Sequence, residues 1–275
     1  MTIDSHQHFW KYNSVNHAWI NDDMKVIQRD FLPEDLEPIL KQHKIDGCIS
    51  VQADQNETET DFLLNLSNQN DFVKGVVGWV DLRDNNIDER LEYYAQFEKL
   101  KGFRHIVQGE NDTEFMLRPQ FKQGITKLRP YNFTYDILIY HYQLEQAIQF
   151  VKLFPEQKFV INHIAKPDIK SGEYAQWQIN MKKISLYQNV YCKISGMVTE
   201  ADWNDWKELD FKIYLDTVVE AFGTDRLMYG SDFPVCLLAA DYDKQLNIVQ
   251  NYISGFSNTE KNKIMGENAI EFYNI

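Results

Sequence analysis

Two histidines near the start of the chain, His6 and His8, have a spacing that could support metal or acid–base chemistry. Residues two apart on a β-strand point to the same side, so both imidazoles would project together from the end of one strand. A pair of neutral imidazoles can form half of a divalent-metal site, although surface histidines show the same spacing. Near the other end of the chain, an apolar run at 227–229 leads to Asp232, whose carboxylate could complete such a site.

The segments that must position these residues alternate between apolar strands and amphipathic helices. After the N-terminal strand, further strands are predicted at 45–52, 72–82, 102–107, 134–139, 158–163, 189–196 and 226–229. Helices are predicted between and after them, at about 31–44, 57–68, 87–97, 118–129, 143–154, 174–187, 211–222, 242–253 and 259–272.

This alternation predicts a single (β/α)8 TIM barrel that spans residues 1–275. The strands are nearly continuous apolar runs, which is typical of parallel sheets buried on both faces. Dividing 275 residues among eight units gives about 34 residues each, the size of one βα repeat. An open doubly wound sheet is the alternative, but it would usually carry a glycine-rich loop after its first strand, where this chain has His-Gln-His.

Composition excludes several classes of partner. The formal net charge of −13 disfavours binding to nucleic acid or to an anionic membrane.

Three cysteines lie far apart, which fits free thiols in a reducing compartment better than a disulfide framework. We find no signal peptide and no apolar run of about 18 residues, and so expect a cytoplasmic protein without a membrane span. The sequence indicates no oligomeric state.

Polar and aromatic side chains are concentrated where the predicted strands end, and in a (β/α)8 barrel these ends share one face. Five of the seven histidines lie at or near these ends, although random placement would put most on helices and outer loops. This concentration indicates a functional site. The candidates are His6, His8, Trp10, Gln52, Trp79, Arg104, His105, Gln108, His141, His163, Lys166, Lys193 and Asp232.

Six stretches of the sequence, IDSHQHFW, GFRHIVQGE, FVINHIAKP, CKISGM, LMYGSDFPVC and MGENAIEFY, carry a family resemblance. Together they resemble the sugar-lactonase branch of the amidohydrolase superfamily, which includes L-fuconolactone and L-rhamnonolactone hydrolases. The matches run from residue 3 to residue 236 and continue in the last helix. They are specific for the branch and much less specific for the substrate.

The resemblance implies that His6, His8, His163 and Asp232 surround one divalent metal, zinc, or in metal-free relatives the substrate carbonyl. Asp232 would be the general base. The chain lacks an obvious carboxylated lysine that could bridge two metal ions, so a two-metal site is not expected. Arg104 and His105 occupy the position of that lysine on the fourth strand. The wider superfamily also has a fifth-strand ligand, which His141 could supply, although the lactonase branch does not require it.

The implied reaction is the hydrolysis of a sugar-derived aldonolactone, a small-molecule substrate. A carboxylate can take a proton from water and return it to the ring oxygen, while zinc or neutral imidazoles hold the oxyanion. Candidate donors and acceptors for the sugar are Gln52, Arg104, His105, Gln108, Lys166, Lys193 and His141, and Trp10 and Trp79 could offer apolar faces.

Other interpretations are open at this stage. Arg104 could form an ion pair with Glu110 or Asp136, the two lysines and Gln52 could be structural, and both tryptophans could belong to the core. An aromatic-acid decarboxylase of the same superfamily is the alternative enzyme. A catalytically silent sugar-binding barrel is the alternative outside enzymes, although retention of the histidine pair and of Asp232 speaks against it.

Overall fold

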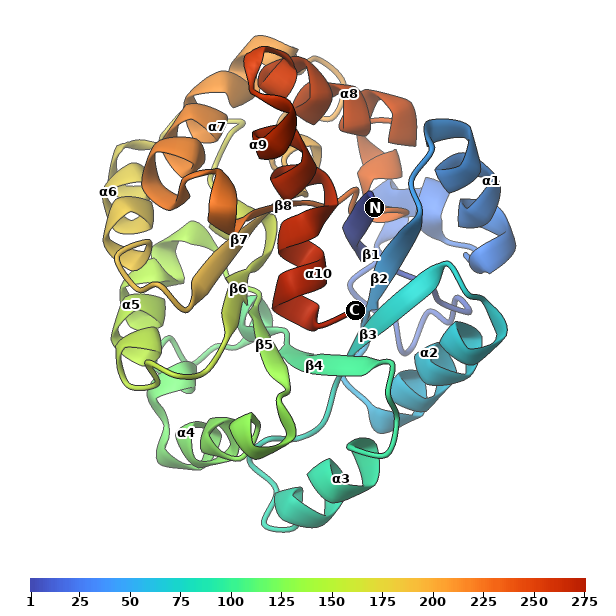
Figure 1. Cartoon of the computed structure of the whole chain (residues 1–275), viewed down its shortest axis with the longest axis vertical. Coiled ribbons are helices and arrows are strands. Elements are labelled where there is room, and N and C mark those ends of the chain that lie inside the picture. The colour runs from blue at the N-terminus through green and yellow to red at the C-terminus, as the bar shows by residue number, and fades with distance from the viewer.

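The computed structural model describes residues 1–275 and contains one sheet of eight parallel strands, which follow each other around the barrel in sequence order (Figure 1). This confirms the predicted (β/α)8 barrel. The strands are β1 (Ile3–Gln7), β2 (Gly47–Val51), β3 (Val73–Gly78), β4 (Leu100–His105), β5 (Thr134–Ile137), β6 (Phe159–Ile161), β7 (Val190–Ile194) and β8 (Leu227–Tyr229).

Helices cover the outside of the barrel, one after each strand. They are α1 (Pro33–His43), α2 (Glu57–Gln69), α3 (Ile87–Tyr94), α4 (Pro119–Thr126), α5 (Leu144–Lys152), α6 (Ala175–Ile184), α7 (Glu208–Phe222) and α8 (Tyr242–Tyr252), followed by α9 (Asn258–Asn262) and α10 (Asn268–Tyr273). The predicted last helix is interrupted between α9 and α10 at Gly266. A Cβ atom on Gly266 would lie 2.1 Å from the backbone oxygen of Met1, so the close approach of the first residues requires glycine there.

The seam between β1 and β8 closes the barrel and is held by a few specific bonds instead of a regular ladder. The amide of His8 donates to the carbonyl of Phe233 at 2.7 Å, and the amide of Asp232 donates to the carbonyl of His6 at 2.8 Å. The buried carboxylate of Asp4 accepts from the amides of Ser231 at 2.9 Å and His6 at 3.2 Å. The same bonds that close the barrel therefore fix the backbone of the candidate residues on both strands.

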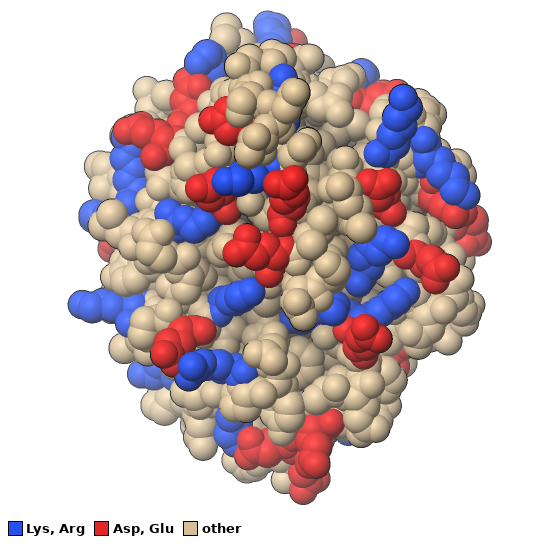
Figure 2. Space-filling view, in the orientation of Figure 1, with Lys and Arg blue, Asp and Glu red and all other residues tan.

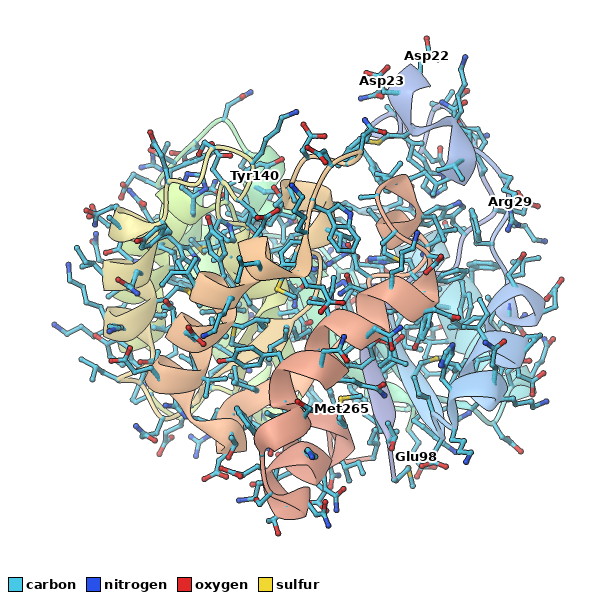
Figure 3. The ribbon with its side chains drawn as sticks, turned by 90° about the horizontal axis from the view of Figure 1, so that it is seen from above. Asp22, Asp23, Arg29, Glu98, Tyr140 and Met265 are labelled. Carbon is cyan, nitrogen blue, oxygen red and sulfur yellow. The ribbon has the colours of Figure 1, made fainter.

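The two ends of the barrel differ in what covers them. Helix α10 lies across the amino-terminal end of the strands, where Phe272 and Tyr273 join a small apolar cluster with Ile3, Val77 and other strand residues (Figure 1). Viewed from the side, Tyr140 marks the opposite, carboxyl-terminal end, and Met265 lies below (Figure 3). That upper end is not covered by α10 and is where the predicted site residues lie.

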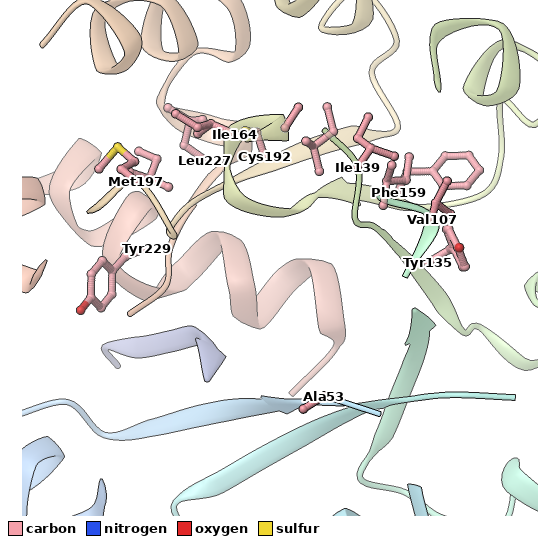
Figure 4. Close-up of a cluster of buried hydrophobic side chains, with 14 of the residues drawn as sticks. Ala53, Val107, Tyr135, Ile139, Phe159, Ile164, Cys192, Met197, Leu227 and Tyr229 are labelled. Carbon is pink, nitrogen blue, oxygen red and sulfur yellow. The ribbon is translucent and has the colours of Figure 1, made fainter. Parts of the chain in front are cut away.

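The main apolar core lies between the strands and the surrounding helices, and Figure 4 shows part of it. All three cysteines, Cys48, Cys192 and Cys236, are free and buried. The apolar runs around Cys48 and Cys192 predict their burial, whereas the sequence around Cys236 does not. The outer surface carries interspersed acidic and basic side chains on the face of Figure 1, without a continuous basic patch in that view (Figure 2). None of the helices has the length and apolar character needed to cross a membrane.

Candidate active site

Three imidazoles converge on one carboxylate oxygen at the carboxyl-terminal end of the barrel. The Nε2 atoms of His6, His8 and His163 lie 3.9, 3.3 and 3.7 Å from Oδ1 of Asp232. Each of the four side chains is at most 5% exposed. The arrangement brings together β1, the loop after β6 and the loop after β8, as the sequence predicted.

The backbone that carries His163 is unusual. Four consecutive residues, His163 to Lys166, have positive φ angles of 53°, 47°, 60° and 45°, and none of them is glycine. Asp232 also has a positive φ, 58°. Positive φ in non-glycine residues costs free energy and is concentrated at functional sites, where the surrounding fold holds it in place.

Two glycines allow close approach of the backbone to two of these imidazoles. A Cβ atom on Gly196, which follows β7 with φ +62°, would lie 2.5 Å from Nδ1 of His163. A Cβ atom on Gly230 would lie 2.7 Å from Cβ of His6. These contacts explain the glycines in the CKISGM and LMYGSD stretches, because any larger residue would displace an imidazole.

The hydrogen-bond partners of the imidazoles set their protonation. Nδ1 of His8 lies 2.7 Å from the carbonyl oxygen of Val51, which only accepts, so Nδ1 carries the proton. In neutral His8, Nε2 is then an acceptor that faces the Asp232 carboxylate oxygen. Two acceptors 3.3 Å apart require a proton or a cation between them. Nδ1 of His163 is 2.9 Å from Oγ of Ser195, which can act as donor or acceptor.

Burial favours neutral histidines in this site. Burial lowers the pKa of His8, and it lowers the pKa values of His6 and His163 well below their usual range. For His6, the nearby charge of Lys193 lowers the pKa further. Burial raises the pKa of Asp232, but the positive charges of His163, His8 and Lys166 in their protonated forms, with a hydrogen bond from protonated His8, outweigh this effect and the net pKa is lowered. When the imidazoles are neutral, a cation between His8 and Asp232 would take the place of that proton. The site therefore combines an ionised carboxylate with neutral imidazoles, which are the forms that bind metal.

A compact set of donors fits one divalent ion. Ligand atoms of His6, His8 and Asp232 lie within 4.8 Å of one another and all three residues are buried. Two imidazole nitrogens and a carboxylate oxygen, with room for water, are a donor set that zinc accepts. His163, the fourth predicted ligand, lies outside this compact group, although its Nε2 also faces Asp232.

Beneath the imidazoles, one buried ammonium group and one buried carboxylate lie in the barrel interior. Nζ of Lys193 lies 2.7 Å from Oδ2 of Asp136 and 3.4 Å from Nδ1 of His6, with no exposed side-chain surface. Tyr273 of α10 donates to Oδ1 of the same carboxylate at 2.9 Å. Lys193 is therefore positioned to support His6 from below and does not reach the pocket above it.

Arg104 lies between this interior network and the pocket. Its Nη1 donates to Oδ1 of Asn162 at 3.1 Å and lies 3.3 Å from Nε2 of His6, and its Nη2 contacts the backbone and side-chain oxygens of Gln52. The guanidinium therefore pairs directly with neither Glu110 nor Asp136. Burial lowers the pKa of Arg104 to about 10, so the group stays charged at neutral pH. Gln52 acts as its support and does not line the pocket.

A pocket of about 370 Å³ opens above Asp232. Of the residues predicted to bind substrate, Arg104, Gln108 and Lys166 line it. Side-chain oxygen Oε1 of Gln108 is buried there without a partner. A somewhat larger pocket between the loops after β6 and β7 and helix α7 contains none of the predicted site residues. The full lining of the site pocket is His8, Trp19, Met24, Ala53, Arg104, Ile106, Gln108, Leu138, Tyr140, His163, Lys166, Thr199, Glu200, Trp203, Asp232, Val235 and Leu238.

Four further predicted substrate residues lie outside the pocket. His105 follows the inward-facing Arg104 on β4, so it points outward, stacks on Phe115 and pairs with Glu110 at 2.7 Å. Trp79 donates toward His105, at 3.3 Å from its Nδ1. Trp10 is 1% exposed and belongs to the core behind His8. His141 contacts the carbonyl of Lys166 at 3.0 Å through Nδ1. None of these four side chains lines the site pocket.

Several lining residues were not singled out from the sequence. Glu200 and Trp203 lie in the loop after β7, Tyr140 ends the segment after β5, and Trp19 and Met24 come from the long first loop. The length and aromatic content of the loops that carry them could have identified these residues from the sequence. Long loops at this end of a barrel commonly form the pocket wall.

An eight-stranded parallel barrel with imidazoles and a carboxylate converging at its carboxyl-terminal end defines a TIM-barrel hydrolase with a metal-binding donor set. The chain belongs to the amidohydrolase family, whose model matches residues 3–275.

Three comparisons place the chain within this family. It is 36% identical to an L-fucono-1,5-lactonase of Burkholderia multivorans, over 99% of this chain and 96% of that protein. It is 23% identical to an L-rhamnono-gamma-lactonase of Scheffersomyces stipitis, over 66% of this chain and 61% of that protein. A solved amidohydrolase from Burkholderia multivorans with bound zinc superposes with a TM-score of 0.97 at 35% identity, covering 100% of this chain and 99% of that one.

Proposed function

We propose that this protein hydrolyses a sugar-derived aldonolactone, of the L-fuconolactone or L-rhamnonolactone kind, to the open-chain sugar acid. The observation that carries the proposal is the convergence of three imidazole nitrogens on one oxygen of Asp232 at the floor of the pocket. The lactonase relatives support the choice of substrate class. The geometry gives no specific support to an aromatic-acid decarboxylase or to a silent binding barrel.

Asp232 is the proposed general base. Its carboxylate is ionised because its pKa is lowered, and it opens to the pocket, so it can take a proton from an attacking water and later return that proton to the ring oxygen. His8 is held by its bond to the Val51 carbonyl, which keeps Nε2 directed at Asp232. The fixed charge of Arg104 favours the negative charge that develops on the lactone carbonyl oxygen.

The residues that would hold zinc are His6, His8 and Asp232, with His163 facing the same oxygen. A bound zinc ion would supply Lewis acidity and lower the pKa of a water molecule. The proposed compartment is the cytoplasm, which the free and buried cysteines support.

The test is a pH-indicator assay of purified protein against a panel of aldonolactones, with Asp232→Asn as the key variant. Asparagine keeps the size of the side chain but cannot take a proton, so kcat should fall by about a hundredfold or more. Circular dichroism checks that the variant is folded. Near-wild-type turnover by folded Asp232→Asn would exclude Asp232 as the base, and wild-type protein inactive on every lactone would overturn the proposed function.

A further inference from the structure

One wall of the pocket carries an ion pair that the catalytic chemistry does not use. Nζ of Lys166 lies 3.1 Å from Oε1 of Glu200, and the two side chains are 17% and 18% exposed. The pair joins the loop after β6 to the loop after β7 and faces the same pocket as Asp232. Both groups are therefore accessible to a bound molecule while being largely removed from bulk water.

The surroundings hold Lys166 in one position and keep it charged. Its φ angle is 45°, its carbonyl accepts from His141, and its ammonium lies over the ring of Tyr140 at 5.5 Å from the centroid. Burial lowers the pKa of Lys166, but the charges of Glu200 and Asp232 outweigh this effect and the net pKa is raised. The carboxylate of Glu200 has no protein partner other than Lys166.

A carboxylate beside an ammonium offers an acceptor and a donor at neighbouring positions. Two adjacent hydroxyl groups on a sugar ring need this combination, because one can donate to the carboxylate while the other accepts from the ammonium. Gln108 lines the same pocket, and its side-chain Oε1 is buried without a hydrogen-bond partner. Trp203, Leu138 and Leu238 make other parts of the wall apolar.

We propose that Glu200 and Lys166 together bind two neighbouring hydroxyl groups of the lactone and thereby set the preference for a polyhydroxylated ring. This inference rests on the proposed lactonase function. A lactone without hydroxyl groups would remove solvent from the partly exposed Glu200 carboxylate and would offer no hydrogen bond in its place. Sites built to bind a hydroxyl group reject analogues that lack it more strongly than apolar pockets reject an extra group.

The experiment compares two substrates that share the reacting ester. L-fucono-1,5-lactone carries ring hydroxyls, and δ-valerolactone has a six-membered lactone ring without them. In Glu200→Gln, kcat/KM for the sugar lactone should fall about fivefold to tenfold more than kcat/KM for δ-valerolactone, the effect of replacing a hydrogen bond to a carboxylate by a hydrogen bond to a neutral amide. Where δ-valerolactone turns over too slowly, its competitive inhibition constant gives the comparison.

A matched control lies in the same two loops. Lys170 and Asp202 form an ion pair at 3.2 Å that also joins the loop after β6 to the loop after β7, but neither residue lines the catalytic pocket. Asp202→Asn therefore removes a loop-to-loop ion pair without removing a hydroxyl partner. Its ratio of kcat/KM values for the two lactones should stay at the wild-type level.

The outcomes separate this inference from the function on which it rests. A selective loss on the sugar lactone in Glu200→Gln, with an unchanged ratio in Asp202→Asn, supports hydroxyl binding by the pair. Equal losses of kcat/KM on both lactones in Glu200→Gln would show that the Lys166–Glu200 pair only shapes the loops. The same selective loss in Asp202→Asn would show this too, and either result would overturn the inference. If the panel assay shows turnover of another aldonolactone and not of L-fucono-1,5-lactone, that aldonolactone takes its place in the comparison. Wild-type protein that hydrolyses no aldonolactone of the panel would overturn the proposed function instead.

Discussion

Replacing Gly196 by alanine should disable the site through a single methyl group. The new Cβ would lie 2.5 Å from Nδ1, 2.7 Å from Cγ and 3.0 Å from Cβ of His163. These atoms are the base of the imidazole and not the free end of a flexible chain, so the ring can escape only by moving as a whole. That movement would break the bond to Ser195 and shift Nε2 away from Asp232.

The expected magnitudes follow from two separate costs. A non-glycine residue in a left-handed conformation costs about 1–2 kcal/mol, and Gly196 has φ +62°. Overpacking a tight site costs about 1–3 kcal/mol more. We therefore expect the free energy of unfolding to fall by about 2–5 kcal/mol. Displacement of a catalytic group by about 1 Å can lower kcat by about a hundredfold, which is the expected effect here.

Gly172→Ala is the matched control for the backbone cost. Gly172 also has a positive φ, +72°, but a Cβ atom there would have nothing within 4 Å. This variant should lose only the backbone contribution, about 1–2 kcal/mol, and keep its kcat. Urea denaturation measures the first quantity, and lactone hydrolysis normalised to the folded fraction measures the second. Wild-type kcat in folded Gly196→Ala would refute the view that this close contact positions His163.

Two further predictions concern stability and metal. Burial raises the pKa of Glu59 from 4.5 to about 8, so its contribution to stability is complete below pH 4.5 and is lost as pH rises through about 8, by up to about 5 kcal/mol. Between pH 5 and pH 8 the free energy of unfolding should fall by about 3–4 kcal/mol more in the wild type than in Glu59→Gln, and an equal fall in both proteins would contradict the assignment. Elemental analysis of protein purified without chelator should find about one zinc per chain, and less in folded His8→Ala. Metal-free wild-type protein with full activity would exclude a zinc requirement while leaving the role of Asp232 untouched.

The barrel could be predicted because each of its strands and helices is recognisable from a short stretch of sequence. Each strand is an apolar run and each helix has its own apolar stripe, so the alternation is visible without knowing any contact. The convergence of His6, His8, His163 and Asp232 followed from the fold, since the carboxyl ends of parallel strands share one face. The positions of these residues at strand ends were therefore sufficient to place them together.

Other features of the site depend on orientation or on distant partners. Arg104 and His105 are neighbours on β4, and the alternation of side chains sends only one of them into the barrel. That rule was available from the sequence, but which of the two faces inward was not. The pairing of Lys193 with Asp136 and of Lys166 with Glu200 joins residues that lie far apart along the chain. The left-handed run from His163 to Lys166 contains no glycine and so gave no signal.

The closure of the barrel between β1 and β8 has a consequence for how the activity is divided along the chain. The first four βα units contribute His6, His8 and Arg104, whereas the last four contribute His163 and Asp232. The second half of the chain holds Asp232, the proposed general base, and only one of the three imidazoles that face it, because His6 and His8 belong to the first half. Separated halves should each be inert, and activity should return only when they reassociate, because the bond between Asp4 and the amide of Ser231 joins the two halves at the site itself.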